Sequence, residues 1–236
     1  MSRLELFAIH GVGEVQAGDD LVTLFLEALD LQGDDVRDND VVIVTSKVVS
    51  KAEGRVVPFD GTNEQREALI TQESTRVLRR RGPLRITETP HGFVNANAGI
   101  DHSNAAPDTA VLLPLDPDRS ARRFRGALQR ARGVSVGVVI TDTFGRTWRN
   151  GVTDVALGAA GLVTILDLRG TLDATGRRLD VTEVAIVDEL AGAANLILAK
   201  DAATPFALVR GLNPAFFGNG SVVGDVVRPP SGDLFR

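Results

Sequence analysis

The sequence predicts an α+β or mixed α/β protein in which mixed sheets are interspersed with helices. Two apolar runs, at residues 41–44 and 134–140, have the composition of strands that are buried on both faces. A third observation is the helical spacing of apolar residues elsewhere, most clearly at Leu21, Phe25 and Leu29. Helices do not follow strands one for one, so the sequence does not predict a regular parallel βαβ fold.

The N-terminal half is predicted to contain five strands and two helices. Residues 4–9 form the first strand, and a loop leads from it to a helix that starts at Gly18-Asp19-Asp20. A second helix is predicted over residues 63–81, with Leu69, Ile70 and Val77 as its inner apolar stripe, and the three arginines at 79–81 would suit the negative end of its dipole. The other strands of this half are predicted at residues 41–44, 84–86, 93–96 and 110–113.

The C-terminal half begins with a strong helix-start signal, Asp-Pro-Asp at residues 116–118, and this helix is predicted to extend to Arg132. The buried strand at 134–140 follows, and then helices at 153–160 and 184–199 and a last strand at 206–209. Beyond Asn213 the chain is rich in Gly and Pro and is expected to lie over the surface. The length allows one large domain or two intimately packed subdomains, and we expect a main domain over 1–212 and a tail or connector over 213–236.

Composition excludes several classes of protein. The chain has no cysteine, which rules out disulfides, thiolate metal sites and a cysteine nucleophile. Its net charge of −5 and the lack of a broad basic patch argue against a nucleic-acid partner. No apolar stretch approaches the roughly 20 residues that a membrane helix needs, and the N-terminus lacks a signal-peptide profile. We therefore expect a cytoplasmic protein with no membrane partner.

Two acidic loops are the main candidates for chemistry. Asp142 and Thr143 come directly after the buried strand at 134–140, where open sheets place ligands. Asp101 and Asn104 lie in a loop led by Gly99, where the side chains could converge on one ligand or form an Asx-turn. Paired carboxylates suit a hard divalent cation, and such cations manage phosphates.

Basic residues lie in two further candidate segments. Lys47 and Lys51 follow Ser46 and Ser50, and a helix here would put both lysines on one face, either as solvated surface or to meet nucleotide phosphates. The fragment Gly11-Val12-Gly13 is either a plain turn or a loop whose backbone N–H groups line a phosphate or a purine.

Near the second acidic loop, Arg146 and Arg149 could clamp a carboxylate or a phosphate, whereas Trp148 is expected in the core. No P-loop or Gly-x-Gly-x-x-Gly motif occurs, and the three histidines form no zinc triad. The residues alone thus indicate a metal-dependent, phosphate-handling enzyme.

Six motifs in register carry a resemblance to a known family. They are Gly18-Asp19-Asp20-Leu21, Val49-Ser50-Lys51-Ala52-Glu53-Gly54, Asn97-Ala98-Gly99-Ile100-Asp101-His102-Ser103-Asn104, Leu113-Pro114-Leu115-Asp116-Pro117-Asp118, Ile140-Thr141-Asp142-Thr143-Phe144-Gly145-Arg146 and Val209-Arg210-Gly211-Leu212. In this order they resemble the coenzyme F(420):L-glutamate ligase family, which includes archaeal CofE and the N-terminal domain of FbiB. The resemblance runs from about residue 4 to residue 212.

The resemblance implies a GTP-dependent ligase with an unusual α+β fold. Such an enzyme adds L-glutamate to the deazaflavin precursor F(420)-0, then adds γ-linked glutamates, and releases GDP and phosphate. The family implies Mg²⁺ or Mn²⁺, with two ions expected, stimulation by K⁺, and a homodimer. Alternatives are a nucleotide-binding module without catalysis and a metal-dependent phosphate-ester hydrolase.

Site residues follow from the resemblance position by position. Asp101, Asp142 and Thr143 match metal ligands. Lys51, which would offset phosphate charge, and the possible substrate clamps Arg146 and Arg149 are the catalytic candidates. The positions that match nucleotide contacts are Val12, Gly13, Glu14, Val15, Ser46, Lys47, Lys51 and Asn104.

The chain departs from the family pattern at three places. Its first loop, Gly-Val-Gly-Glu, lacks a proline that relatives often have, and residues 199–204 lack the acidic, Gly-rich pattern of archaeal relatives. The tail at 227–236 resembles the connector to the nitroreductase-like, FMN-binding domain of FbiB. The chain is therefore expected to be either a stand-alone ligase or the N-terminal domain of a longer protein.

Overall fold

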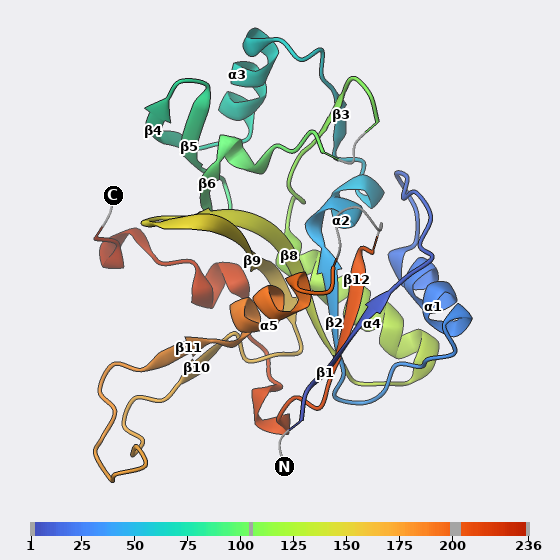
Figure 1. Cartoon of the computed structure of the whole chain (residues 1–236), viewed down its shortest axis with the longest axis vertical. Coiled ribbons are helices and arrows are strands. Elements are labelled where there is room, and N and C mark those ends of the chain that lie inside the picture. Colours follow the sequence, from blue (N-terminus) through green and yellow to red (C-terminus); the bar gives the residue numbers. More distant parts are fainter. Residues whose placement is uncertain (1–2, 104–105, 199–203, 235–236) are drawn as a thin grey trace.

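The computed structural model describes residues 3–103, 106–198 and 204–234 and confirms an α+β fold. Its centre is a five-stranded mixed sheet, shown in Figure 1, in which only the β2–β8 pair is parallel. The strands in sheet order are β1 (Glu5–Ile9), β12 (Phe206–Arg210), β2 (Val41–Thr45), β8 (Gly137–Arg146) and β9 (Arg149–Ala160).

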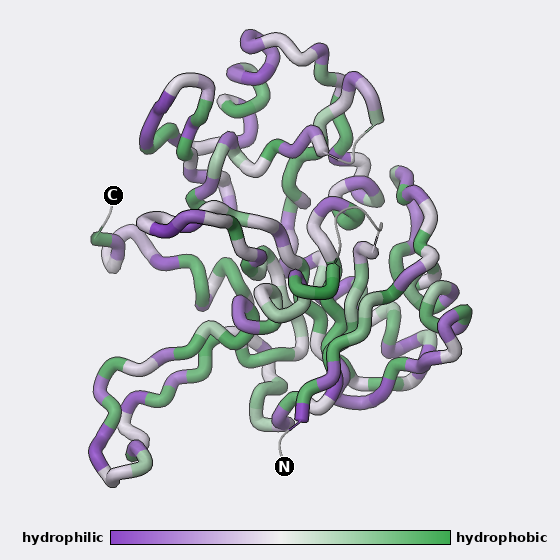
Figure 2. The backbone as a smooth tube through the Cα atoms, in the orientation of Figure 1, coloured by the Kyte–Doolittle hydropathy of each residue, from purple (hydrophilic) through white to green (hydrophobic). Residues whose placement is uncertain are grey.

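Helices cover both faces of this sheet, which explains the unbroken apolar runs in its central strands. On one face lie α1 (Leu21–Leu31), α2 (Ser46–Ala52) and α4 (Pro117–Arg132), and on the other α5 (Ile186–Asn195). Side chains of β2 alternate between these two cores, so that Val42 packs toward α1 and Ile43 toward α5. Figure 2 shows the result as a hydrophobic centre under a more hydrophilic periphery.

A second part of the chain packs against one end of the central sheet (Figure 1). It contains α3 (Asn63–Gln72), the antiparallel sheet β4 (Arg76–Arg81), β5 (Leu84–Glu88) and β6 (Val94–Ala96), and the pair β3 (Val56–Pro58) and β7 (Thr109–Val111). Phe93, just before β6, makes an edge contact with Phe144 of β8 at 6.3 Å between ring centroids. The cleft described below lies between these two packed parts.

A two-stranded arm of β10 (Ile165–Asp167) and β11 (Glu183–Ala185) extends away from this body (Figure 1). The predicted helix at 184–199 therefore begins two residues late, because residues 183–185 pair with β10. The end of that prediction, from residue 199, falls outside the described residues.

The predicted helix at 63–81 is wrong in its second half. The helix α3 ends at Gln72, and Arg79, Arg80 and Arg81 lie on the strand β4 instead of at a helix end. A tight turn at Gly82, which has a positive φ of 55°, lets β4 pair with β5. Cross-strand pairing thus overrides the helical pattern that the sequence suggests.

The predicted helix at 153–160 is also wrong, because this segment is the strand β9. Its small residues allow a close approach rather than a helix: a Cβ on Gly158 would lie 2.2 Å from the carbonyl carbon of Pro117 at the start of α4. The strand predicted at 134–140 extends as β8 to Arg146. Asp142 therefore lies inside a paired strand, opposite Val155, and not just past its end.

The segment after Asn213 is partly built into the core. Val222, in the short helical turn Val222–Val226, is 1% exposed and packs on the α5 face of the sheet. The remaining turns are Pro214–Phe216 and Pro230–Gly232. No helix within the described ranges is both long and apolar enough to cross a membrane.

Candidate active site

A cavity of about 840 Å³ lies between the central sheet and the second part. Its size suits a small-molecule site. Its walls come from the loop after β1, the start of α2, residues 95–103 with Ala106, the β8–β9 hairpin and the approach to β12. The predicted site residues that line it are Val12, Gly13, Glu14, Val15, Ser46, Lys47, Lys51, Asp101, Asp142 and Thr143.

Three carboxylates, those of Asp101, Asp142 and Asp154, line the floor of the cavity. Burial, together with the negative charges of Asp101 and Asp154, raises the pKa of Asp142 to about 7. The amide of Thr143 donates to Asp142 at 2.8 Å, and the hydroxyl of Thr143 donates to Asp154 at 2.6 Å. These oxygens face one another because Thr143 and Asp154 are directly paired in the hairpin.

Asp154 is a candidate residue that sequence reasoning missed. The segment 153–160 was predicted to be a helix, which would not pair it with Thr143. The signal that could have found it is the turn after Arg146, between the two segments that form β8 and β9. A hairpin at this turn places Asp154 beside the Asp142-Thr143 motif.

Asp101 combines the two roles that the sequence left open. Its carboxylate accepts from the amide of Ser103 at 2.7 Å, as in an Asx-turn, and also lies 2.7 Å from the ammonium of Lys47. Burial alone would raise the pKa of Asp101, but Lys47 and Ser103 outweigh it and lower that pKa. Lys47 also donates to the carbonyl and the hydroxyl of Ser103, at 2.7 and 3.0 Å.

The two lysines lie on one face of α2, as expected if this segment is helical. Lys51 is 8% exposed and is paired with Glu14 of the loop after β1. A buried ammonium is costly without a counter-charge, so a carboxylate or a phosphate must face it. The pair of lysines therefore gives one end of the cavity the charge that an anionic ligand needs.

The donor atoms at the cavity are oxygens, the type that a hard cation prefers. Asp101, Asp142 and Asp154 supply carboxylate oxygens and Thr143 supplies a hydroxyl. Within the described residues, no group of three or more His, Cys, Asp or Glu side chains could hold a metal ion. A cation here would thus need further oxygen ligands, and Mg²⁺ commonly takes one or two carboxylates together with substrate phosphates.

Two more polar side chains at the cavity were not predicted. Asn95 and Thr141 line it, and the Asn95 amide and the Thr141 hydroxyl are buried with no hydrogen-bond partner among the described residues. Such groups are uncommon in folded proteins and often mark functional sites.

Two predicted residues, Arg146 and Arg149, are exposed beside the tip of the β8–β9 hairpin and do not line the cavity. The predicted nucleotide contact Asn104 falls outside the described residues. The prediction that Trp148 packs in the core is wrong, because its side chain is 89% exposed. It occupies the turn of a hairpin whose strands pair Arg146 with Arg149.

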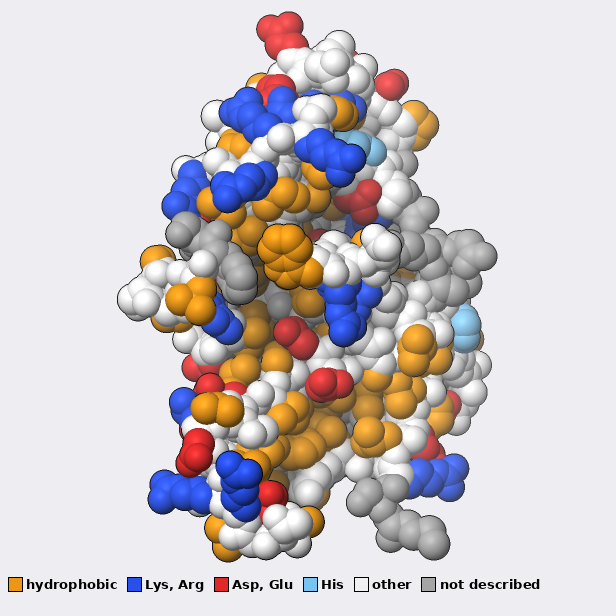
Figure 3. Space-filling model, turned by 60° about the vertical axis from the view of Figure 1, so that its left-hand side comes forward, with side chains coloured by type: hydrophobic (Ala, Val, Ile, Leu, Met, Phe, Trp, Pro, Cys, Tyr) orange, Lys and Arg blue, Asp and Glu red, His pale blue; other side chains and the backbone are white. Residues whose placement is uncertain are grey.

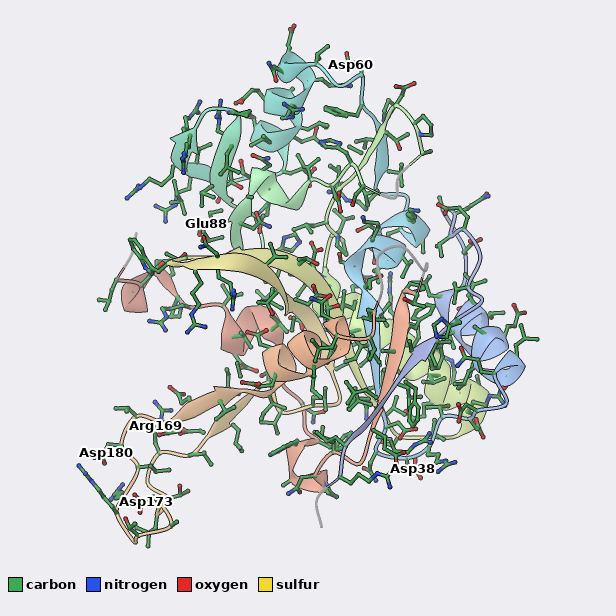
Figure 4. The ribbon with its side chains drawn as sticks, in the orientation of Figure 1. Asp38, Asp60, Glu88, Arg169, Asp173 and Asp180 are labelled. Carbon is green, nitrogen blue, oxygen red and sulfur yellow. The ribbon has the colours of Figure 1, made fainter. Side chains whose placement is uncertain are left out.

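Charged residues far from the cavity are engaged locally. Figure 4 labels Arg169, Asp173 and Asp180 on or near the projecting arm and Asp60 at the far end of the second part. Arg169 pairs with Asp167 at 2.7 Å, and Asp60 accepts from Thr62. These residues therefore suit control experiments.

The cavity thus combines carboxylates with a lysine-bearing end, a composition that suits an anionic ligand together with a cation. The model of the F(420)-0:gamma-glutamyl ligase family matches residues 11–211. The coenzyme F(420):L-glutamate ligase of Methanothermobacter thermautotrophicus is 38% identical over 249 residues, which cover 99% of both chains. The proteins of the same name from Methanopyrus kandleri and Halobacterium salinarum are 41% and 40% identical, and cover 94% and 99% of this chain and 94% and 96% of their own.

These matches make the chain a ligase. It belongs to the coenzyme F(420):L-glutamate ligase family.

Proposed function

We propose that the protein uses GTP to add L-glutamate to the lactyl carboxylate of F(420)-0 and then adds γ-linked glutamates. One observation carries the proposal: in a member of this family, the predicted metal ligands Asp101 and Asp142 and the predicted phosphate contacts Lys47 and Lys51 line a single cavity. The lysine ammonium groups at one end of the cavity could bind the phosphates of a nucleotide, and the carboxylates beside them could bind its metal ion.

The reaction must activate a carboxylate before an amine can attack it. In the proposed first step, an oxygen of the lactyl carboxylate attacks the γ-phosphorus of GTP, forming an acyl phosphate and expelling GDP. The amine of glutamate then attacks the acyl carbon, phosphate leaves, and the nitrogen loses a proton to give the amide. Positioning and charge neutralisation should dominate such a phosphoryl transfer.

The chain's residues divide this work by place. Lys51, and Lys47 when it is released from Asp101, would neutralise phosphate oxygens at the α2 end. Asp101, Asp142 and Thr143, with Asp154 behind Thr143, would hold the divalent cations. Mg²⁺ or Mn²⁺ bound there, with two ions expected, would supply further neutralisation of phosphate charge, and K⁺ is expected to stimulate the enzyme. The loop Val12-Gly13-Glu14-Val15, with Ser46 and Asn104, would contact the nucleotide.

The decisive experiment incubates the protein with GTP, Mn²⁺, K⁺, F(420)-0 and glutamate and follows added glutamyl units by mass. Asp142→Ala is expected to abolish glutamate addition while the variant stays folded, because it removes a central carboxylate of the cavity. The matched control is Asp180→Ala on the projecting arm, which should leave the activity unchanged. Retained activity in Asp142→Ala would remove Asp142 from the metal site.

The assay also separates the alternatives. GTP that binds without any mass added to F(420)-0 would indicate a non-catalytic module, and phosphate release that ignores glutamate would indicate a hydrolase. We further expect a homodimer, for which light scattering would give twice the chain mass of 25.1 kDa.

A further inference from the structure

We propose that the acceptor substrate docks outside the cavity, on a surface formed by Arg79, Arg81, Arg146, Trp148 and Arg149. This docking surface would take an anionic molecule that carries a flat aromatic ring. The inference rests on the proposed function only for the identity of that molecule, F(420)-0.

The first half of the docking surface is a row of side chains that leads out of the cavity. Arg79 is paired with Ile86, and Ile86 is paired with Ala96, which lines the cavity. Directly paired residues point to the same face of a sheet, and so does Arg81, two residues after Arg79. With about 4.8 Å between neighbouring strands, Arg79 lies about 10 Å from the cavity wall.

The second half is the tip of the β8–β9 hairpin. Phe144 and Val152 of this hairpin line the cavity, and Arg146, Trp148 and Arg149 follow beyond them toward the tip. Trp148 has a φ of 64°, a conformation that is unfavourable for a bulky residue. A large aromatic side chain held exposed by a strained turn is more typical of a binding site than of a structural turn.

This surface carries positive charge that is not neutralised by a neighbouring carboxylate of the described residues. Arg79, Arg81, Arg146 and Arg149 are exposed and make no ion pair with any described residue. Some arginines elsewhere, such as Arg55 and Arg210, are paired with carboxylates, whereas others, such as Arg122, are exposed and also make no ion pair with a described residue. What sets the docking surface apart is therefore its position beside the cavity. Figure 3 shows basic side chains gathered on this face around hydrophobic ones, although the chain as a whole is acidic. The local charge therefore suits an anion.

The position and chemistry of the surface favour the acceptor as its occupant. The lysine end of the cavity suits the nucleotide, and residues of β6 and of the hairpin line the cavity together with Asp101 and Asp142. An acceptor whose carboxylate is activated at these aspartates would therefore extend past β6 and the hairpin. Guanidinium groups bind carboxylates in a bidentate manner, and indole stacks on flat rings. A deazaflavin with a lengthening oligoglutamate chain offers both partners.

Trp148 is also the natural probe, because the chain has one tryptophan and no tyrosine. Titrating the full chain with F(420)-0, without GTP or glutamate, should quench the tryptophan emission in a saturable manner, whereas GTP with Mn²⁺ should not. Free protein should emit as an exposed indole at all protein concentrations. Quenching by GTP but not by F(420)-0, or a blue-shifted emission that depends on protein concentration, would overturn the proposal.

Variants test the same surface through binding and kinetics. Trp148→Ala should raise the Kd and KM for F(420)-0 about tenfold, with the KM for GTP unchanged. The double variant Arg79→Ala, Arg81→Ala should raise the Kd several-fold at low salt and less at high salt, because salt screens exposed charges. Its matched control is Arg177→Ala, Arg178→Ala on the arm, which removes the same charge from an exposed region remote from the cavity.

The outcomes keep this proposal separate from the ligase reaction. Quenching that weakens in the Arg79→Ala, Arg81→Ala double variant but not in its Arg177→Ala, Arg178→Ala control supports docking even if no glutamate is added, in which case the proposed function fails alone. Glutamate addition with a KM for F(420)-0 that Trp148→Ala leaves unchanged overturns docking and leaves the ligase reaction intact.

Discussion

At the scale of single residues, Asp142 links the electrostatics of the cavity to the stability of the fold. Its carboxylate lies among protein atoms and near Asp101 and Asp154, and these surroundings raise its pKa to about 7. In the unfolded chain the same group ionises near its ordinary value of 3.8. A raised pKa in the folded state means that stability falls as the pH rises from about 4 to about 7.

This predicts a specific difference from Asp142→Asn, which cannot ionise. In metal-free buffer, raising the pH from 5 to 8 should destabilise the wild type but not the variant at this position. The difference between their free energies of unfolding should therefore grow by about 2 kcal/mol in favour of the variant. Urea unfolding at the two pH values measures this gain, and Asp180→Asn on the arm serves as the control. An equal pH dependence in wild type and variant would show that Asp142 ionises normally.

At the scale of elements, Gly158 fixes how closely α4 approaches the central sheet. A Cβ at this position would lie 2.2 Å from the carbonyl carbon and 2.4 Å from the carbonyl oxygen of Pro117. Both atoms belong to the backbone at the start of α4, so neither can move without shifting the helix. Because β9 also carries Asp154, this contact supports the geometry of the cavity floor.

Gly158→Ala is therefore expected to lower the free energy of unfolding by about 3 kcal/mol through overpacking. The matched control is Gly126→Ala, in the middle of α4, where the nearest atom to a new Cβ is the end of the Arg130 side chain at 3.5 Å. That change should stabilise the protein by up to about 1 kcal/mol, because alanine is the better helix former. Thermal or urea unfolding would contradict the packing argument if both variants behaved alike.

At the scale of the whole molecule, one buried carboxylate joins three distant segments. Asp118, in the first turn of α4, is 3% exposed and accepts from the amide of Ala159 in β9 at 2.8 Å. It also accepts from the hydroxyl of Ser221 at 2.8 Å and the amides of Val222 and Val223 at 3.0 and 3.1 Å. The segment after Asn213 is thus held by the same group that joins α4 to the sheet.

Asp118→Ala should cost about 3 kcal/mol of stability or more, since it leaves several buried N–H groups without an acceptor. Limited proteolysis should then cut within residues 213–234 before the rest of the chain unfolds. Ser221→Ala, which removes one of these hydrogen bonds, should cost about 1 kcal/mol. A tail as resistant to protease in Asp118→Ala as in the wild type would show that Asp118 does not hold it.

The sequence by itself determined the elements whose signals are local. The apolar runs of β1, β2 and β12 and the capped helices α1 and α4 were all predicted, because burial, spacing and helix-start residues are written within each segment. The motifs also led us to expect that Asp101, Asp142, Lys47 and Lys51 would share one site, and all four line the same cavity. Each of these lies within a continuous motif in the sequence.

Only the tertiary structure decided what depends on a partner strand or a neighbouring surface. Residues 153–160 form a strand because β8 and the start of α4 lie beside them, and that pairing brings Asp154 to the cavity. Residues 76–81 leave the predicted helix because β5 pairs with them. Trp148 is exposed because it occupies the hairpin turn, beyond the reach of either core. Such contacts join residues far apart along the chain, and no local pattern of side chains encodes them.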